Sequence, residues 1–274
     1  MMMTKPRLDQ LLIERGLASS RQQAQALILS GRVIVEGMQL PKAGSRVPAD
    51  IAVSVTGPLH PFVGRGGLKL QGALDSFRVD VTGMTALDIG SSTGGFTDCL
   101  LQRGAARVVC IDVGHGQLDW KLRNDPRVTV FEGVNARYLP PDLLGGLAGA
   151  IGLAVVDVSF ISLKLILPVI PPLLSPRSGG IIALVKPQFE VGRGKVGKGG
   201  IVRSPQLRFE AVTGVGLFAI NEGLGVIGCA ASPIAGAEGN QEYFIHLSVT
   251  PGGLTQGELE QHVIELTREE EGRN

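Results

Sequence analysis

Two charged residues stand where apolar strands are expected to end. Asp157 lies in GLAVVDVSF (152–160), and Lys186 lies in GGIIALVKP (179–187). Buried charges are costly unless they form ion pairs or take part in chemistry. The carboxyl ends of neighbouring parallel strands meet at one edge of a sheet, so we expect both side chains to face one crevice. The pattern is compatible with a structural ion pair and with a reactive pair.

Such a pair suits the methylation of a sugar hydroxyl. A ribose hydroxyl is a weak nucleophile, so its proton must be oriented or removed, and a partly desolvated lysine near other positive charge can act as the base. Carboxylates would orient the lysine and offset its charge. Lys69 in RGGLKL and Glu242 in GNQEYF are further candidates for this set. No metal is required, and Cys99, Cys110 and Cys229 have no metal-binding spacing.

A glycine-rich loop, DIGSSTGGFT (88–97), follows the first strand of the expected sheet. The dinucleotide fingerprint G-x-G-x-x-G fails because its middle position is Ser92, which disfavours NAD and FAD. Asp112 ends the next strand and is well placed to hold ribose hydroxyls. S-adenosylmethionine has a ribose but no phosphate, so it suits this loop. On spacing alone, a tight turn with a helix cap at Thr97 is equally compatible.

The segment after Lys186, FEVGRGKVGKGGIVRSP, is rich in glycine and in cations. Residues 186–203 contain five basic residues against Glu190 alone. Cations on a mobile segment can meet phosphates, so we expect a substrate-binding flap beside the crevice. A solvated flexible loop is the alternative interpretation.

The elements that must position these residues alternate along the chain. Apolar strands are expected at 85–90, 107–114, 127–133, 152–160, 179–187, 224–233 and 242–249, with helices at 96–103 and 204–223. Strands that alternate with helices predict a parallel, doubly wound α/β sheet. The last two strands have only a short link, so we expect them to pair antiparallel.

Residues 1–60 are expected to form a separate small domain. Two short helices at 7–16 and 21–31, the second capped by Ser20, precede an expected hairpin around Glu36-Gly37 in RVIVEGMQL and a further strand at 51–57. GPLHP then breaks the pattern, so we place the boundary near residues 57–62 and assign residues 61–274 to a second domain. Residues 1–66 hold eight basic and four acidic residues, a balance compatible with nucleic acid.

The composition is that of an ordinary globular protein, with 44% hydrophobic and 19% charged residues in a chain of 274. No apolar run approaches the ~20 residues of a membrane helix. We therefore expect a cytoplasmic protein without membrane contacts, whose acidic tail (269–271) is solvated.

Several longer stretches resemble known families. RLDQLLIERGLASSRQQAQALILSGRVIVEG (7–37) resembles the RNA-binding domain named after small-subunit ribosomal protein four. The downstream part resembles FtsJ-like ribose methyltransferases, through VGRGGLKL, DIGSSTGGFTD, LRNDPRV, DVSFISL and LVKPQFEVGRGKVGKGG. Together they are similar to the hemolysin-A-like (TlyA) family of ribosomal RNA methyltransferases. This resemblance implies a Rossmann-like class I methyltransferase sheet with a small N-terminal α+β RNA-binding domain.

The resemblance also implies the activity and the site. The reaction would be 2′-O-methylation of cytidine in ribosomal RNA or ribosomal subunits, with S-adenosylmethionine as the methyl donor. Its catalytic set maps onto Lys69, Asp157, Lys186 and Glu242. The residues expected around the cofactor are Asp88, Gly90, Ser91, Ser92, Thr93, Gly94, Gly95, Phe96, Asp112, Asn135 and Asp157. The residues expected to bind RNA are Arg7, Arg21, Arg32, Lys42, Arg65, Arg193, Lys195 and Lys198.

Two departures and several alternatives remain. Asn135 stands where FtsJ-like enzymes often have an aspartate near the adenine, and Gly64 replaces a serine. A membrane-active hemolysin is disfavoured because no spanning segment or cationic amphipathic helix is visible. A non-catalytic RNA-binding or ribosome-assembly factor would not need four charged residues at one crevice. A base methyltransferase would need the missing D/N-P-P-Y/F motif, and pseudouridylation would leave the glycine loop unexplained.

Overall fold

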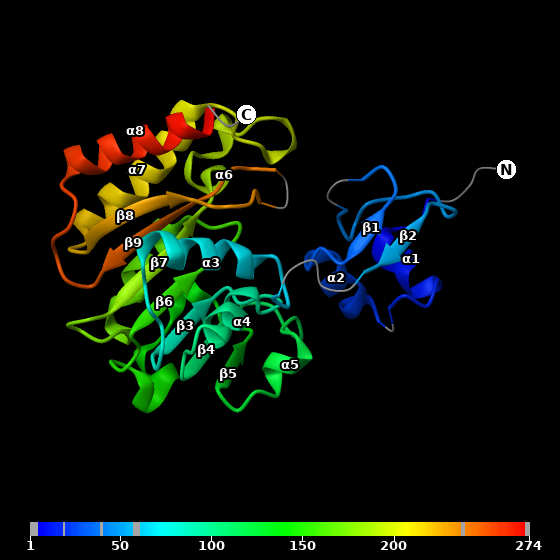
Figure 1. The fold of residues 1–274 in the computed structure, drawn as a ribbon, viewed down its shortest axis with the longest axis horizontal. Helices are drawn as coiled ribbons and strands as arrows, with labels where there is room; N and C mark the ends of the chain where they lie inside the picture. Colours follow the sequence, from blue (N-terminus) through cyan, green and yellow to red (C-terminus); the bar gives the residue numbers. More distant parts are fainter. Residues whose placement is uncertain (1–4, 19, 39–40, 57–60, 237–238, 272–274) are drawn as a thin grey trace.

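The computed structural model describes residues 5–18, 20–38, 41–56, 61–236 and 239–271. The N-terminal elements form a small body beside a larger one that contains the rest of the chain (Figure 1). The predicted domain boundary near residues 57–62 falls largely on residues 57–60, which lie outside the described part, so the boundary stays a prediction.

The small body contains two helices and a two-stranded sheet: α1 (Leu8–Glu14), α2 (Arg21–Leu29), β1 (Val33–Val35) and β2 (Val53–Val55). Ser20 caps α2 as expected, because its side chain accepts a hydrogen bond of 3.1 Å from the Gln23 N–H. The apolar faces of the helices close on a core of their own, which includes Leu8, Leu12 and Val35. This core is separate from the two hydrophobic clusters of the larger body.

The expected hairpin at Glu36-Gly37 is wrong in its pairing. The Met38 N–H does close a turn on the Val35 carbonyl, and Gly37 has a φ of 73°. However, Val35 and Met38 form only an isolated bridge, and β1 instead pairs antiparallel with β2. A local turn signal does not say which strand completes the ladder, and both β1 and the later strand show the alternating pattern. Residues 39–40 of the expected hairpin lie outside the described residues.

The larger body is built on a seven-stranded sheet, in the order β5-β4-β3-β6-β7-β9-β8. Its strands are β3 (Thr85–Ile89), β4 (Arg107–Asp112), β5 (Val128–Glu132), β6 (Leu153–Val156), β7 (Gly180–Val185), β8 (Gly225–Ala231) and β9 (Tyr243–Ser248). The strands from β3 to β7 pair in parallel. The predicted antiparallel pairing of the last two strands is confirmed, and β9 lies between β7 and β8.

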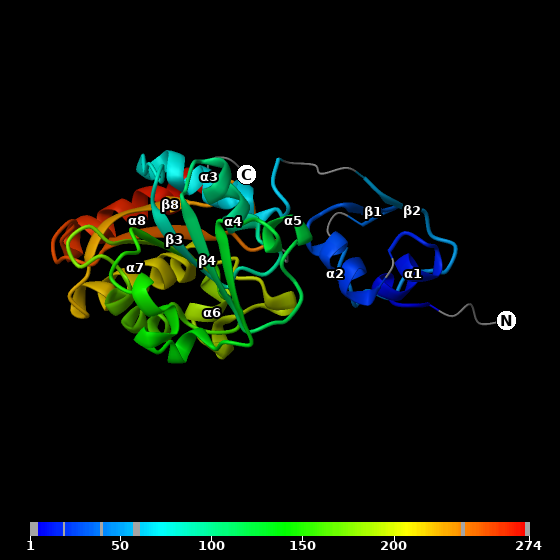
Figure 2. The ribbon, with the colours of Figure 1, turned by 90° about the horizontal axis from the view of Figure 1, so that it is seen from below.

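Helices cover both faces of this sheet, so the predicted doubly wound α/β architecture is confirmed. One face carries α3 (Gly66–Phe77) and α4 (Gly95–Gln102), with α5 (Trp120–Arg123) near its edge, and the opposite face carries α7 (Pro205–Asn221) and α8 (Gln256–Glu271). Figure 2 shows α3 and α4 on one side of the strands and α7 on the other. The short helix α6 (Pro187–Glu190) follows β7 directly.

Short 3-10 helices fill the connections: η1 (Ala136–Tyr138), η2 (Pro141–Leu147), η3 (Leu163–Leu165), η4 (Leu167–Val169), η5 (Pro171–Leu173), η6 (Arg193–Lys195) and η7 (Lys198–Gly200). The helices α3, α5, α6 and α8 are additions to the predicted elements. The expected solvated tail is the end of α8, whose apolar side buries Leu259 and Val263. No helix in the described part of the chain is long and apolar enough to cross a bilayer.

The centre of the sheet determines where a ligand can lie. β3 has β4 on one side and β6 on the other, so the chain leaves β3 toward one face and β6 toward the opposite face. This is a topological switch point, and the loops after the two strands open a crevice at the carboxyl edge. The glycine-rich loop and Asp157 both lie there.

Candidate active site

Four charged side chains meet in two ion pairs at the carboxyl edge of the sheet. Lys69 on α3 contacts Glu242, with 2.5 Å between Nζ and Oε2. Lys186, which follows β7, contacts Asp157, which follows β6, with 2.6 Å between Nζ and Oδ1. Glu242 precedes β9, and because β9 is antiparallel to β7 its first residues lie beside the end of β7. The structure thus brings the predicted catalytic set together.

Burial and charge act in opposite directions on Asp157. Burial raises the pKa of its carboxyl, but the positive charges of Lys186 and Lys69 lower it by more, so the pKa lies below its usual range. Asp157 is therefore ionised at neutral pH. The side chains of Lys69 and Lys186 are only 12% and 11% exposed, so these ion pairs are only weakly screened by water.

Ser159 is a site residue that sequence reasoning missed. Its Oγ accepts a hydrogen bond of 2.8 Å from the Lys186 Nζ, so the amine is held between Asp157 and Ser159. The signal for it was present, because Ser159 belongs to the DVSF stretch two residues after Asp157.

Backbone approaches backbone closely where the glycine loop meets its neighbours. Gly90 has a φ of 85°, and a Cβ there would lie 2.4 Å from the Asp157 carbonyl oxygen. A Cβ on Gly95 would lie 2.9 Å from the Gly67 backbone nitrogen. Only glycine fits at these contacts. They bring the start of α3, and with it Lys69, against the loop that follows β3.

Asp112 ties the glycine loop to the end of β4. Its carboxylate accepts hydrogen bonds of 2.7 Å from the Ser92 N–H and 2.7 Å from the Gly114 N–H. Ser92 has a φ of 47°, a left-handed conformation that is uncommon outside glycine, and this bond helps to hold it. The Ser92 hydroxyl also contacts Gln117, a further residue that sequence reasoning missed.

Two adjoining cavities open at this edge. The larger, of about 410 Å³, has the polar residues Asp112 and Asn135 among apolar walls that include Ile111, Val134 and Ile161. The smaller, of about 230 Å³, is lined by four charged residues, Arg65, Lys69, Asp157 and Lys186. Both cavities are lined by Gly90, Ser92, Asp157 and Ser159. A small molecule in the larger cavity would therefore reach the charged set in the smaller one.

Most of the residues expected around the cofactor line one of these cavities, but two lie elsewhere. A Cβ on Gly94 would meet the side chain of Leu122, away from the crevice. Asp88 is fully buried and accepts a hydrogen bond of 2.6 Å from the Thr97 hydroxyl. Burial raises the pKa of Asp88 to about 7, against the opposing effect of the Thr97 bond. A cofactor contact by either residue stays a prediction.

Asn135 is placed in the larger cavity, at the start of η1. Its Oδ1 accepts a hydrogen bond of 3.0 Å from the Arg137 N–H and thereby caps that helix. The side-chain amide nitrogen is the atom that an adenine could meet. The adenine contact stays a prediction.

The residues expected to bind RNA are distributed over both bodies. Arg65 lines the smaller cavity, and Lys195 pairs with Glu210 on α7, with 2.9 Å between Nζ and Oε2. In the small body, Arg32 donates to the Thr56 carbonyl, and Lys42 is exposed. The side chains of Arg193 and Lys198 lie outside the described part of the structure.

Arg7 and Arg21 share one buried carboxylate, that of Asp9. In the described ranges, no group of three or more histidine, cysteine, aspartate or glutamate residues is arranged to hold a metal ion.

Comparisons with known proteins assign this chain to a family. Residues 62–249 match the FtsJ-like methyltransferase family, and residues 6–49 match the S4 domain. The chain is 49% identical over 247 residues to the 16S/23S rRNA (cytidine-2′-O)-methyltransferase TlyA of Mycobacterium tuberculosis, covering 90% of this chain and 91% of the relative. This chain belongs to the TlyA family of FtsJ-like methyltransferases. The family resemblance predicted from the sequence is thereby confirmed.

Other TlyA-like proteins carry a different name. The chain is 39% identical to Hemolysin A of Brachyspira hyodysenteriae, over 89% of this chain and 100% of the relative. A solved structure of a candidate hemolysin from Streptococcus thermophilus is 39% identical, with a TM-score of 0.74 over 99% of this chain and 98% of that one. This solved structure therefore matches nearly the whole length of the chain.

Proposed function

We propose that this TlyA-family chain transfers a methyl group from S-adenosylmethionine to the ribose 2′-hydroxyl of a cytidine in ribosomal RNA. The observation that carries the proposal is the presence of two ion pairs, Lys69–Glu242 and Asp157–Lys186, beside two adjoining cavities and a glycine loop. The match to FtsJ-like methyltransferases and the activity named for the Mycobacterium tuberculosis relative support the same chemistry. The substrate would be ribosomal RNA or a ribosomal subunit in the cytoplasm.

The larger cavity suits S-adenosylmethionine. Pockets for small ligands have apolar walls and a few converging polar groups, which is the composition found around Asp112 and Asn135. Asp112 would hold the ribose hydroxyls, because its two backbone hydrogen bonds leave carboxylate lone pairs for further donors. Gly90 would let the cofactor lie against bare backbone. When bound, S-adenosylmethionine supplies a methyl group already activated by the positive charge on sulfur.

Lys186 is the group that orients the 2′-hydroxyl, and as a neutral amine, after its ammonium form has released one proton to solvent, it takes the proton of that hydroxyl. Lys186 lines the smaller cavity beside Asp157 and Ser159, which border both cavities, and the ionised Asp157 offsets the charge that the amine gains on protonation. Ser159 fixes the direction of the amine. Lys69, held by Glu242, keeps Asp157 in its ionised form through a second positive charge. These residues position the nucleophile, and in-line positioning accounts for much of the rate of such a transfer.

The test is the incorporation of labelled methyl groups from S-adenosylmethionine into ribosomal subunits, followed by mapping of the modified nucleotide. We expect a 2′-O-methylcytidine, and we expect Lys186→Ala to reduce turnover roughly 10²-fold or more, which is typical of removing a general base. The affinity of Lys186→Ala for S-adenosylmethionine should change little. Lys121→Ala, at an exposed lysine on α5, is the control and should keep full turnover. Near-normal turnover of Lys186→Ala, or methyl groups found on bases, would contradict the proposal.

A further inference from the structure

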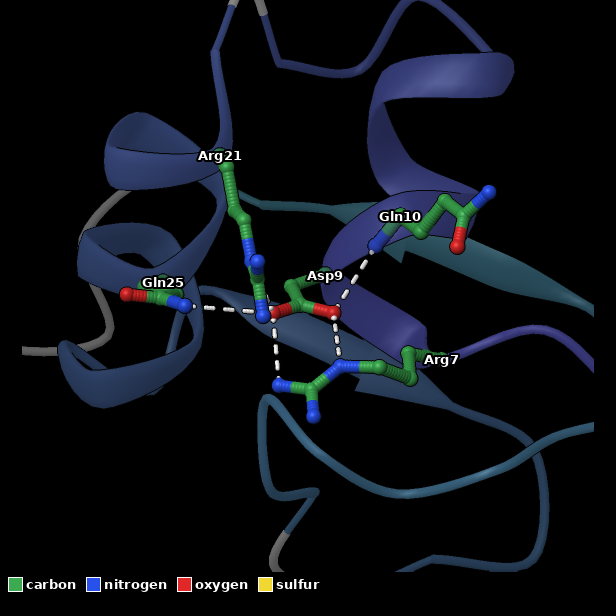
Figure 3. Close-up of polar contacts among 5 residues, drawn as sticks. All are labelled: Arg7, Asp9, Gln10, Arg21 and Gln25. Carbon is green, nitrogen blue, oxygen red and sulfur yellow. Dashed lines mark hydrogen bonds and ion pairs between the residues drawn. The ribbon is translucent and has the colours of Figure 1, made fainter.

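Five donors converge on one buried carboxylate in the small N-terminal body (Figure 3). Arg7 contacts both oxygens of Asp9, from Nε to Oδ1 at 3.0 Å and from Nη2 to Oδ2 at 2.9 Å. Arg21 donates from Nε to Oδ2 at 3.1 Å, and Gln25 donates to the same oxygen at 3.1 Å. The Gln10 backbone N–H completes the set at 3.0 Å from Oδ1. The acceptor capacity of this carboxylate is fully used.

Asp9 is charged although it is buried. Its side chain is 1% exposed, whereas those of Arg7 and Arg21 are 41% and 63% exposed. The hydrogen bonds from the arginines and Gln25 hold the pKa of Asp9 far below its usual range, against the effect of burial. The anion therefore lies beneath two cations that reach the surface. The group as a whole has two positive charges and one negative charge, so it keeps an excess of one positive charge toward solvent.

The position of Asp9 explains why the side chains of both arginines converge on it. Arg7 precedes α1, Asp9 lies in its first turn, and Arg21 is the first residue of α2. The carboxylate therefore joins the starts of two helices. Two guanidinium groups brought this close repel each other, and the shared carboxylate offsets that repulsion. Arg21 uses only Nε in this ion pair, so its two terminal nitrogens make no hydrogen bond to Asp9 and can act as a fork for another anion.

We propose that Asp9 is a positioning residue for RNA, which holds Arg7 and Arg21 as a pre-oriented pair of phosphate ligands. This inference rests on the proposed function, in which the chain binds ribosomal RNA. Arginine side chains are long, and fixing them costs conformational entropy on binding. A pair already fixed by a buried carboxylate avoids part of that cost, and two forks in register recognise backbone phosphates with a defined geometry.

Replacing Asp9 with asparagine separates orientation from charge. Asp9→Asn raises the net charge of the small body by one, so attraction between charges alone predicts tighter RNA binding. The positioning role predicts the reverse, because the two guanidinium groups lose their shared anion and move apart. We expect affinity for purified ribosomal RNA to fall about tenfold, with a log–log salt slope shallower by roughly 0.7–0.9 for each phosphate that is no longer neutralised. Thermal unfolding of the variant shows whether the small body is still folded.

Arg21→Lys is the second variant in this experiment, because the substitution keeps the positive charge and buries no new group. A lysine cannot reproduce the planar fork that Asp9 orients. We expect RNA affinity about three- to tenfold below that of the unaltered chain. Arg15→Lys is the matched control: Arg15 is an exposed arginine of the same body that donates to the Ala49 carbonyl and does not touch Asp9. Its RNA affinity should stay within about twofold.

The outcomes are distinguishable. Weaker RNA binding by Arg21→Lys but not by Arg15→Lys supports the inference, even if Asp9→Asn fails to fold. RNA binding by a folded Asp9→Asn that equals or exceeds that of the unaltered chain would overturn it, as would equal affinities of the two lysine variants. If the unaltered chain itself neither binds ribosomal RNA in a salt-dependent way nor methylates it, the proposed function fails and the inference fails with it.

Discussion

The carboxylate oxygens of Asp112 combine a structural role with a proposed role in cofactor binding. Its carboxylate holds the glycine loop through the Ser92 and Gly114 N–H groups, and it faces the larger cavity. We expect Asp112→Ala to weaken S-adenosylmethionine binding on the order of 1.5–3 kcal/mol, since the variant lacks a charged acceptor for the ribose hydroxyls. Calorimetry measures this directly. Asp119→Ala, which removes the cap of α5, is the control, and equal cofactor affinity in both variants would refute the role given to Asp112.

Asp88 makes stability depend on pH. In the folded chain burial raises its pKa to about 7, whereas an unfolded aspartate titrates near ~3.9. Between these values the folded state retains a proton that the unfolded state has released. The free energy of unfolding therefore falls as the pH rises from about 4 to 7, and the loss is complete above that range.

Asp88→Asn removes this titration while nearly preserving the shape of the side chain. We expect the difference in unfolding free energy between Asp88→Asn and the unaltered chain to shift in favour of the variant by about 2–4 kcal/mol from pH 4 to pH 8. Denaturant unfolding at several pH values gives this difference. Comparing the two proteins cancels other groups that titrate nearby, such as His246, whose pKa burial lowers. A difference that is constant with pH would show that Asp88 does not carry the titration.

The sequence revealed one half of the site more directly than the other. Asp157 and Lys186 follow parallel strands, so the rule that such strand ends meet was enough to place them together. Lys69 lies on a helix and Glu242 precedes an antiparallel strand, and no periodicity says that these two approach each other. Their pairing came from family resemblance. Ser159 escaped notice although it lies in the same DVSF stretch as Asp157, because a serine does not carry the charge that singled out the other site residues.

At the scale of elements, the loop after β6 is fastened to α6. Glu190 accepts a hydrogen bond of 2.6 Å from the Ser162 hydroxyl and another of 2.8 Å from the Leu163 N–H. The rings of Phe160 and Phe189 lie 5.2 Å apart between the same two segments. Because Lys186 and Asp157 also belong to these segments, we expect Glu190 to help hold the two halves of the ion pair in place.

We expect Glu190→Gln to lower kcat/KM about tenfold, because one of its two acceptor oxygens becomes a donor and the loop shifts relative to Lys186. Steady-state methyl transfer measures the effect. Glu222→Gln, at the exposed C-terminal end of α7, should have no effect on the rate. A Glu190→Gln enzyme as fast as that control would show that the fastening is dispensable.

Elements with strong patterns were predictable, and pairing over a distance was not. Every strand of the large sheet was expected near its observed place, because buried strands are long apolar runs between glycine or proline breaks. The prediction of the strand that pairs with β1 was wrong, because an alternating pattern in one strand does not determine which strand pairs with it. The helix α8 was overlooked because its sequence is dominated by charged residues, and only a narrow apolar stripe with Leu259 and Val263 is buried.

At the scale of the whole molecule, the small body is suited to binding RNA and the larger body to methyl transfer. Cations on the small body can contact phosphates, but every residue proposed to act on the hydroxyl lies in the larger body. The side chain of Leu29, at the end of α2, also lines the smaller cavity, so the two bodies meet at the site itself. Docking of RNA on the small body would therefore deliver a ribose close to Lys186.

A chain that lacks residues 1–60 is accordingly expected to bind S-adenosylmethionine but barely to methylate ribosomal RNA. Cofactor affinity serves as the check that this shortened chain is folded. Methyl incorporation, measured beside the full-length chain, gives the result. Modification of the same nucleotide at the full-length rate would mean that the small body does not position the RNA.

The position of β9 in the sheet also determines the order in which the protein can fold during translation. Lys69 and Glu242 are separated by 173 positions in the chain, and β8 is synthesised before β9, the strand that lies between it and β7. While the chain is being translated, β8 therefore has no neighbour in the sheet, and the second ion pair does not exist. A nascent chain can complete the glycine loop and Asp112 early, but we expect no methyl transfer until nearly its last strand has left the ribosome.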